Sequence, residues 1–358
     1  MLAAAAGALR AELFVSSYND HRVYRYQETN GAFMDVFIPN TNGLLNLPHG
    51  LAFGPDGNLY VASAGNDSVL RYNGTNGAFM DTFVSAGSGG LDYPVALIFR
   101  PDGLLYVSSQ LNDRVLRFNG INGAFVDTFV TNSAALDGPS DMVFGPDGHL
   151  YVVGRFNHRV VRYHGSSGAL LDLFVTGNLS QPFGLRFAAD GNLLAVSAND
   201  NSVQRFNGTN GAFLNAFVAG GAGGLSFPVG IESGPDGNFY VASYSNHKIA
   251  RFDAASGNQL GDFVSVAGNG GLNGPNFMLF RPPQATEILP TLGISLTDSN
   301  VLLHWPTNPA GFRLEQSPVV AASPNWSAVS NSATMVDGSN VVTLPIQVED
   351  RFFRLTRP

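Results

Sequence analysis

Short apolar runs alternate with clusters of Gly, Asn, Asp and Pro along most of the 358-residue chain. In one stretch, NLYVAS at 58–63 is followed by SVLRYN at 68–73 and AFMDTFV at 78–84. Each run is rich in aromatic and β-branched residues and ends at turn-forming residues, which is typical of β-strands. No helical segment separates them. The pattern therefore predicts an all-β protein.

The same pattern returns at a regular interval. The segment GPDGNLYVAS at 54–63 recurs in recognisable form from residues 100, 145, 188 and 234, so that the unit is 43 to 46 residues long. Each unit contains four predicted strands, which we name A to D in chain order. Units of 40–50 residues with four strands and no helix are typical of the blades of a β-propeller.

The two ends of the repeated region complement each other. The N-terminal unit opens at ELFVSS (12–17) without a strand A, whereas GPNFMLFRPP (274–283) supplies a strand A with nothing after it. Pairing the two segments would leave no unpaired sheet edge between first and last units. We therefore predict a six-bladed β-propeller over residues 12–283, closed by the C-terminal innermost strand at about 275–281.

Short motifs between strands B and C carry a family resemblance. NDHRV (19–23), NHRV (157–160) and NHKI (246–249) lie there, and GPDGNLYVA-type segments follow strand A. In these features residues 12–283 resemble NHL-repeat propellers, although an Arg stands in the middle of strand C. The resemblance implies the propeller fold and little about function, because propellers include lyases, lactonases, sensors and binding modules.

Consecutive strands of a blade run antiparallel, so the A–B and C–D turns lie on one face, which we call the turn face. The units hardly differ there: the A–B turn is Pro-Asp-Gly, and the C–D turn is Asn-Gly-x-Asn-Gly in several copies. In four units an Arg of strand C precedes an Asp of strand D by ten residues, which predicts cross-strand ion pairs. The predicted structural pairs are Arg25–Asp35, Arg71–Asp81, Arg117–Asp127 and Arg162–Asp172.

The B–C and D–A loops lie on the opposite face, which we call the loop face, and here the units differ. A single asymmetric site needs positions that break the repeat, and binding residues concentrate on loops held by a rigid scaffold. An Arg beside aromatic side chains suits a carboxylate or sugar ligand, although a solvated Arg fits the same sequence. The predicted ligand-binding residues are Tyr18, His49, Gln110, Asp141, Arg155, Phe156, Phe183, Tyr244 and Asn276.

His49 and Asp141 are the candidate catalytic residues. His49, in LPHGLAF, is the one His at a ring position, and Asp141 is the one carboxylate at the matching positions. A His suits general-base catalysis or metal binding near neutral pH. The segment PHG resembles virginiamycin B lyase-like propellers. Six-bladed lactonases hold a divalent cation in the channel, and that resemblance implies His49, Asp141 and Asn276 as metal ligands, too few for a hard cation by themselves.

Composition narrows the classes of function. The net charge is −8 and Lys248 is the one Lys beside eighteen Arg, so the basic stripe of a nucleic-acid-binding protein is missing. There is no Cys for disulfides or thiolate metal sites.

The Ala-rich segment 1–11 is similar to the end of a secretory signal, or is an N-terminal tail. No other segment is apolar over the length needed to span a membrane.

A second module follows a Pro-containing linker at 284–293. Residues 294–358 alternate apolar and polar positions, and Trp305, FRLEQS and the closing FFRL resemble a small fibronectin type III-like β-sandwich of secreted bacterial proteins.

Taken together, these features lead us to expect an extracellular or periplasmic protein that binds a carbohydrate, peptide or protein through the loop face and channel mouth. The alternative is a lyase or lactonase, with or without a metal, that uses His49 and Asp141.

Overall fold

The computed structural model describes residues 12–41, 43–281, 291–297, 299–307, 312–318, 326–336, 338–346 and 351–356. The Ala-rich segment 1–11 and most of the predicted linker lie outside the described residues. Within those that are described there is no α-helix, as the sequence pattern predicts. Strands β1 to β24 belong to one compact unit, and β25 to β31 belong to a second.

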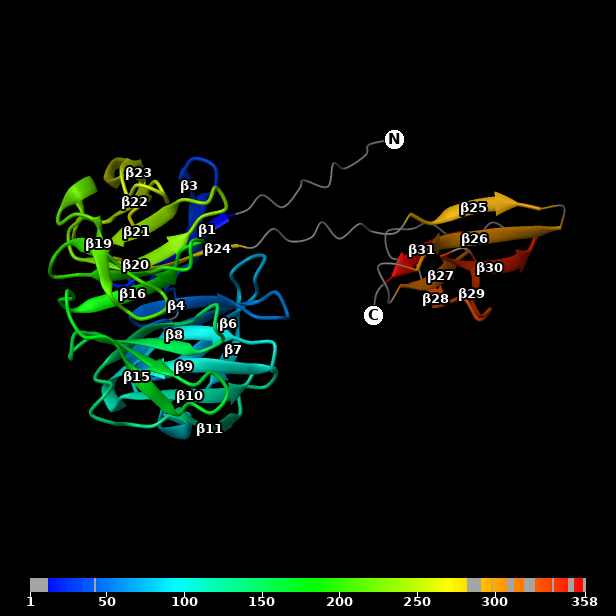
Figure 1. The fold of residues 1–358 in the computed structure, drawn as a ribbon. Helices are drawn as coiled ribbons and strands as arrows, with labels where there is room; N and C mark the ends of the chain where they lie inside the picture. The colour runs from blue at the N-terminus through cyan, green and yellow to red at the C-terminus, as the bar shows by residue number, and fades with distance from the viewer. Residues whose placement is uncertain are drawn as a thin grey trace. The chain divides into compact units, whose positions relative to one another are not determined.

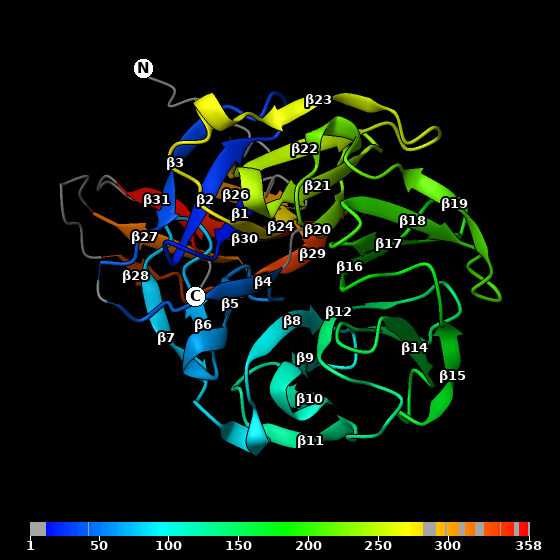
Figure 2. The same ribbon diagram turned by 90° about the vertical axis from the view of Figure 1, so that its left-hand side faces the viewer.

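The first unit consists of four-stranded antiparallel sheets repeated along the chain, with innermost strands near the centre and outermost strands at the rim (Figures 1 and 2). From the innermost strand outward, the sheets are β4 (Pro48–Phe53), β5 (Leu59–Ser63), β6 (Ser68–Tyr72) and β7 (Phe79–Val84); β8 (Pro94–Phe99), β9 (Leu104–Ser109), β10 (Arg114–Asn119) and β11 (Phe125–Val130); β12 (Pro139–Phe144), β13 (Leu150–Gly154), β14 (Arg159–Tyr163) and β15 (Leu170–Val175); β16 (Pro182–Phe187), β17 (Leu193–Ser197), β18 (Ser202–Phe206) and β19 (Phe213–Val218); and β20 (Pro228–Ser233), β21 (Phe239–Ser243), β22 (Lys248–Phe252) and β23 (Gln259–Val264).

One further sheet joins the two ends of the repeated region. It contains β24 (Pro275–Phe280), β1 (Glu12–Ser17), β2 (Arg22–Gln27) and β3 (Phe33–Ile38) in that order. Strand β24 pairs antiparallel with β1, and Leu13 lies opposite Phe280. The C-terminal strand thus occupies the innermost place of the sheet built from the N-terminal strands.

Neighbouring sheets of the first unit pack through aromatic side chains. The ring of Tyr60 on β5 contacts Phe83 of its own sheet and Phe99 of the next, with centroids 4.8 and 4.7 Å away in edge-to-face geometry. Tyr240 on β21 makes the equivalent contact with Phe280 of β24 at 4.8 Å. Four repeats bury a Tyr of strand B in this way, Leu194 and Phe14 stand at the equivalent positions of the other two, and edge-to-face aromatic pairs stabilise beyond the area they bury.

The B–C loops are fastened to the start of the next strand A. His158 and His247 adopt left-handed backbone conformations with φ of 58° in both. Their Nδ1 atoms accept hydrogen bonds from the backbone N–H groups of Gln181 and Gly274, at 2.8 and 3.0 Å. Asp or Asn side chains make the same contact in other repeats, as Asp67 does with Tyr93 N. These two histidines shape the loop connection.

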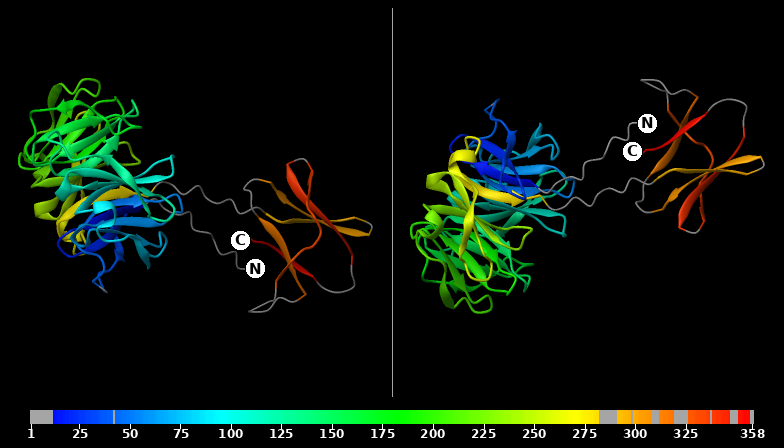
Figure 3. Two further views of the ribbon diagram at one scale, coloured as in Figure 1. Left: turned by 90° about the horizontal axis from the view of Figure 1, so that it is seen from below. Right: turned by 90° about the horizontal axis from the view of Figure 1, so that it is seen from above.

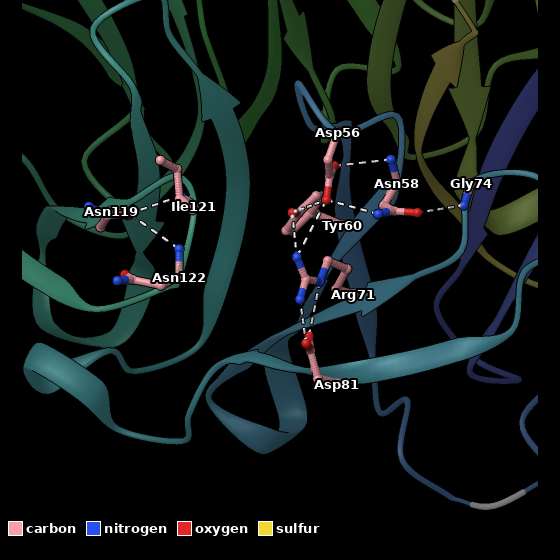
Figure 4. Close-up of polar contacts among 9 residues, drawn as sticks. All are labelled: Asp56, Asn58, Tyr60, Arg71, Gly74, Asp81, Asn119, Ile121 and Asn122. Atoms are coloured by element: carbon pink, nitrogen blue, oxygen red, sulfur yellow. Dashed lines mark hydrogen bonds and ion pairs between the residues drawn. The ribbon is translucent and has the colours of Figure 1, made fainter. Parts of the chain in front are cut away.

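The turn face carries a polar network that recurs between repeats, and Figure 4 shows the copy around Arg71. Arg71 on β6 lies opposite Asp81 on β7 and donates from Nε to its Oδ1 at 3.1 Å. The other arm of its guanidinium reaches Asp56 of the Pro-Asp-Gly turn at 3.4 Å and the Tyr60 hydroxyl at 3.5 Å. Arg25, Arg117 and Arg162 pair in the same way with Asp35, Asp127 and Asp172.

The second unit contains two small sheets (Figure 3). One has β25 (Gly293–Leu296), β26 (Asn300–Pro306), β30 (Ser339–Pro345) and β29 (Thr334–Val336), and the other has β28 (Ser327–Ala328), β27 (Arg313–Ser317) and β31 (Phe352–Thr356). Leu303, Trp305, Val342 and Leu344 of the first sheet and Leu314 of the second form one buried core. Two sheets that share a core are the arrangement of a small β-sandwich.

Candidate functional site

A cavity of about 140 Å³ lies on the loop face, where the innermost strands begin. Strands β4, β16, β20 and β24 each contribute a residue near their starts, and the adjoining loops contribute the rest. The lining residues are Tyr18, His49, Tyr93, Arg155, Phe183, Phe227, Val229, Tyr244 and Asn276. Six of them are among the ligand-binding residues predicted from sequence.

The structure does not bring the other three predicted residues into this cavity. Gln110 is buried at the start of η3 (Gln110–Asn112), with 3% of its surface exposed. Phe156 is 43% exposed, and its ring lies 5.3 Å from the Arg155 guanidinium carbon and beside Gly138. Asp141 lies one residue further along its strand than the residues at the cavity and faces a different set of partners.

Three lining residues were not among the predicted binding residues: Val229, Tyr93 and Phe227. Tyr93 and Phe227 each immediately precede the Pro that begins a strand A, with a positive φ of 55° and 48°. The equivalent residues of the other repeats are Leu47, Gly138, Gln181 and Gly274. The residue before this Pro therefore differs between repeats as strongly as the two residues that follow the Pro. A comparison of the repeats that included this position would have identified both Tyr93 and Phe227.

A chain of hydrogen bonds crosses the cavity from Asn276 to Tyr18. Asn276 Nδ2 lies 2.8 Å from His49 Nδ1, and because an amide NH₂ group only donates, Nδ1 is the acceptor. Neutral His49 then carries its proton on Nε2, 3.5 Å from the Tyr93 hydroxyl oxygen. The hydroxyls of Tyr93 and Tyr18 are 2.7 Å apart. His49 is thus held as a neutral, oriented imidazole.

Burial lowers the pKa of His49 to about 3, and the positive charge of Arg155 acts in the same direction against the opposing hydrogen bond from Asn276. The folded protein therefore keeps His49 neutral, whereas the unfolded chain binds a proton near pH 6.5. Stability conferred by His49 is present above pH 6.5 and is lost as the pH falls towards 3.

We expect the free energy of unfolding to fall more steeply on acidification in the wild type than in His49→Gln. Between pH 6.5 and 4.5 the difference should reach about 2 kcal/mol, because only the wild type gains a proton at this position on unfolding. Urea denaturation at each pH measures it, and His164→Gln on the turn face serves as the control. Parallel pH profiles for wild type and His49→Gln would contradict the assignment.

Arg155 brings to the cavity a positive charge that no carboxylate of the described part of the chain neutralises. Among the described residues it has no ion-pair partner, and its Nε makes no hydrogen bond. Its guanidinium lies over the ring of Phe183, 4.0 Å from the centroid, in a cation–π contact. Burial also lowers the pKa of Arg155 below its usual value, since the charged form is partly removed from water.

The two candidate catalytic residues, His49 and Asp141, have separate partners. Asp141 accepts hydrogen bonds from the backbone N–H groups of Met142 and Leu185, both at 2.9 Å, and pairs with Arg186 at 3.3 Å. Arg186 also pairs with Glu232 at 2.5 Å. Burial raises the pKa of Asp141 to about 6 in spite of Arg186. These three charged residues line a larger cavity of about 590 Å³ that extends along the innermost strands towards the turn face.

The predicted metal ligands are likewise engaged elsewhere. Both Asp141 oxygens accept protein hydrogen bonds, and His49 Nδ1 accepts from Asn276, so the three do not form one ligand set. Within the described ranges, no group of three or more His, Asp or Glu side chains is arranged to hold a metal ion. The same ranges contain no helix long and apolar enough to cross a membrane.

Comparison with solved structures identifies the fold. A chain of a nidogen–laminin complex matches with a TM-score of 0.63 and 17% identity, over 77% of this chain and 100% of that chain. Virginiamycin B lyase from Staphylococcus aureus matches with a TM-score of 0.50 and 15% identity, over 84% and 93%. The first unit is therefore a β-propeller. At these identities the likeness concerns the propeller fold alone.

Other comparisons say little about what the propeller does. A family model described as a repeat of unknown function (DUF6923) matches residues 92–224. A protein of unknown function from Bacteroides caccae is similar to the propeller with a TM-score of 0.58 and 14% identity, over 75% of this chain and 98% of that one. No curated protein matches the chain.

Proposed function

We propose that this propeller is a binding module that recognises a carbohydrate, peptide or protein through its loop face and the channel mouth. The observation that supports it best is the loop-face cavity, where Tyr18, Tyr93, Tyr244, His49 and Arg155 interrupt an otherwise repetitive structure. Tyr and Arg are enriched at sites where a few residues carry most of the binding energy. The lyase or lactonase alternative needs an acid–base pair, and His49 and Asp141 have separate partners.

Several finer features belong to the same proposal. We propose six NHL-type blades closed by β24, a propeller domain at 12–283, a linker at 284–293 and a fibronectin type III-like sandwich at 294–358. The repeat spacing, the β1–β24 pairing and the shared core of the second unit support this organisation. An extracellular or periplasmic location is part of the proposal and is supported by the likeness of the second module to those of secreted bacterial proteins.

A labelled sample of the full chain on glycan and peptide arrays would test the binding function. We expect at least one ligand class to bind, and Tyr244→Ala to weaken that binding about tenfold or more, as truncation of a central aromatic contact does. Ile121→Ser is the matched control, because Ile121 is 82% exposed on a turn-face loop. An absence of binding on both arrays, or a loss caused by Ile121→Ser and not by Tyr244→Ala, would contradict the proposal.

A further inference from the structure

Two hydrogen-bonding groups at the loop-face cavity lack a partner among the described residues. Arg155 Nε is buried without an acceptor, and Asn276 Oδ1 is buried without a donor, although Asn276 is only 3% exposed. The Tyr18 hydroxyl at the same cavity can supply a third hydrogen bond to a ligand. A buried polar group without a partner loses its hydration and gains nothing in return, so a ligand that satisfies both groups gains affinity.

The chain of hydrogen bonds begins at Asn276. Its amide donates to His49 Nδ1, which leaves the His49 proton on Nε2 and makes the Tyr93 oxygen an acceptor. The hydroxyls of Tyr93 and Tyr18 are 2.7 Å apart, and either can donate to the other. Tyr18 lines the cavity together with Arg155. An anion bound beside Tyr18 selects the arrangement in which Tyr93 donates, because the Tyr18 hydroxyl then keeps its hydrogen for the anion.

Charge selects an anion at this position. Aromatic rings alone would also suit an ammonium group, but the positive charge of Arg155 is strong enough at His49 to oppose its protonation. No carboxylate of the described residues pairs with Arg155, so its charge is available to an anionic ligand. A planar carboxylate accepts two parallel hydrogen bonds from a guanidinium, which makes it the best-matched anion.

We propose that the cavity binds a small hydroxy-carboxylate of the hexuronic acid class, an inference that rests on the proposed function of the loop face. The carboxylate accepts from Arg155 and the Tyr18 hydroxyl. A ring hydroxyl donates to Asn276 Oδ1, and the apolar face of the sugar lies against the aromatic rings of Phe227 and Tyr244. A neutral sugar of the same shape leaves Arg155 unpaired.

Calorimetric titration of the full chain with D-galacturonate and D-galactose tests the charge requirement. We expect saturable one-to-one binding of galacturonate and at least tenfold weaker binding of galactose. Trigalacturonate, included as a third probe, distinguishes a site for free acidic sugars from one for the end of an acidic polysaccharide: binding tighter than that of the monomer indicates the polymer.

Variants then assign the contacts. Arg155→Gln should weaken galacturonate binding at least tenfold, and Tyr18→Phe about three- to tenfold, because each removes a donor to the carboxylate. Arg159→Gln is the control, because it changes the net charge by the same amount and Arg159 lies outside the cavity, with its Nε donating to Asn157 O. We expect this variant to bind galacturonate as the wild type does. Thermal unfolding monitored by circular dichroism verifies that each variant is folded.

Three results would overturn the inference: equal affinities for galacturonate and galactose, no galacturonate binding at millimolar concentration, or equal losses in Arg155→Gln and Arg159→Gln. None of them removes the binding function itself, which the arrays decide separately. Array binding that Tyr244→Ala abolishes, combined with no preference for acidic sugars, would leave the loop-face site in place with a ligand of another class.

Discussion

Glu12→Gln is expected to lower the free energy of unfolding by about 3–5 kcal/mol, because it leaves the buried Arg281 without a negatively charged partner and removes one of the two carboxylates on Arg25. Glu12 is 7% exposed and lies between Arg25, at 3.1 Å, and Arg281, at 3.4 Å. Only 6% of the Arg281 side chain is exposed. Gln keeps the shape of Glu12, so the substitution removes the charge with little change in packing.

The position of Glu12 makes this effect specific to the joining of the chain ends. Glu12 begins β1, and Arg281 follows β24 directly, donating its backbone N–H to Glu12 O at 2.8 Å. The Arg281 guanidinium also stacks on Phe14 and Phe53, with centroids at 5.0 and 4.9 Å. The ion pair therefore secures the strand that completes the first sheet.

Asp35→Asn is the matched control, because Asp35 is the other carboxylate on Arg25. Its side chain is 46% exposed, so solvent screens the pair, and we expect a loss of only about 0.2–1 kcal/mol. Urea denaturation of both variants gives the comparison. Equal losses for Glu12→Gln and Asp35→Asn would show that burial does not set the size of the effect.

Gly123→Ala is expected to destabilise the propeller by about 2–5 kcal/mol, from left-handed backbone strain together with steric overlap. Gly123 ends the Asn-Gly-x-Asn-Gly turn with φ of 70°. A Cβ atom at this position would overlap the backbone carbonyl oxygen of Phe83, in the outermost strand of the preceding sheet. Because the obstacle is backbone, no side-chain rotation relieves it.

Gly103→Ala separates the two causes. Gly103 has a φ of 81°, but a Cβ atom there would meet nothing within 4 Å. Gly103→Ala should therefore lower the free energy of unfolding by about 1–2 kcal/mol, from backbone strain alone. Thermal or urea denaturation measures both variants. If Gly123→Ala were no more destabilising than Gly103→Ala, the close contact between sheets would not limit stability.

The close contact at Gly123 explains why the C–D turn is repeated so closely. In the same turn Asn119 Oδ1 accepts from the backbone N–H groups of Ile121 and Asn122, at 2.9 and 3.2 Å (Figure 4). The Asn residues thus fold the turn, and the second Gly lets it approach the neighbouring sheet. Similar residues are needed in every repeat for these structural reasons, without any role in ligand binding.

Much of the fold could be predicted from sequence, because it depends on interactions between residues that are close in the chain. The spacing of strands and turns predicted the all-β repeat, since each unit repeats the same short-range preferences. The ten-residue offset predicted the cross-strand pairs, because a tight turn determines which residues lie opposite: Arg71 faces Asp81, and Arg205 faces Asn215. The incomplete units at the two ends predicted which strand would pair with β1.

Only the tertiary structure decided which residues meet at the loop face. Asp141 and His49 occupy similar positions in their strands, but a shift of one residue turns a side chain towards other partners, so Asp141 meets Arg186. Tyr93 and Phe227 reach the cavity because positive φ angles redirect the chain just before strand A. The sequence by itself determined the repeated scaffold, because that depends on contacts between near neighbours. The site depends on side chains from separate repeats, and only their packing around a common centre brings them together.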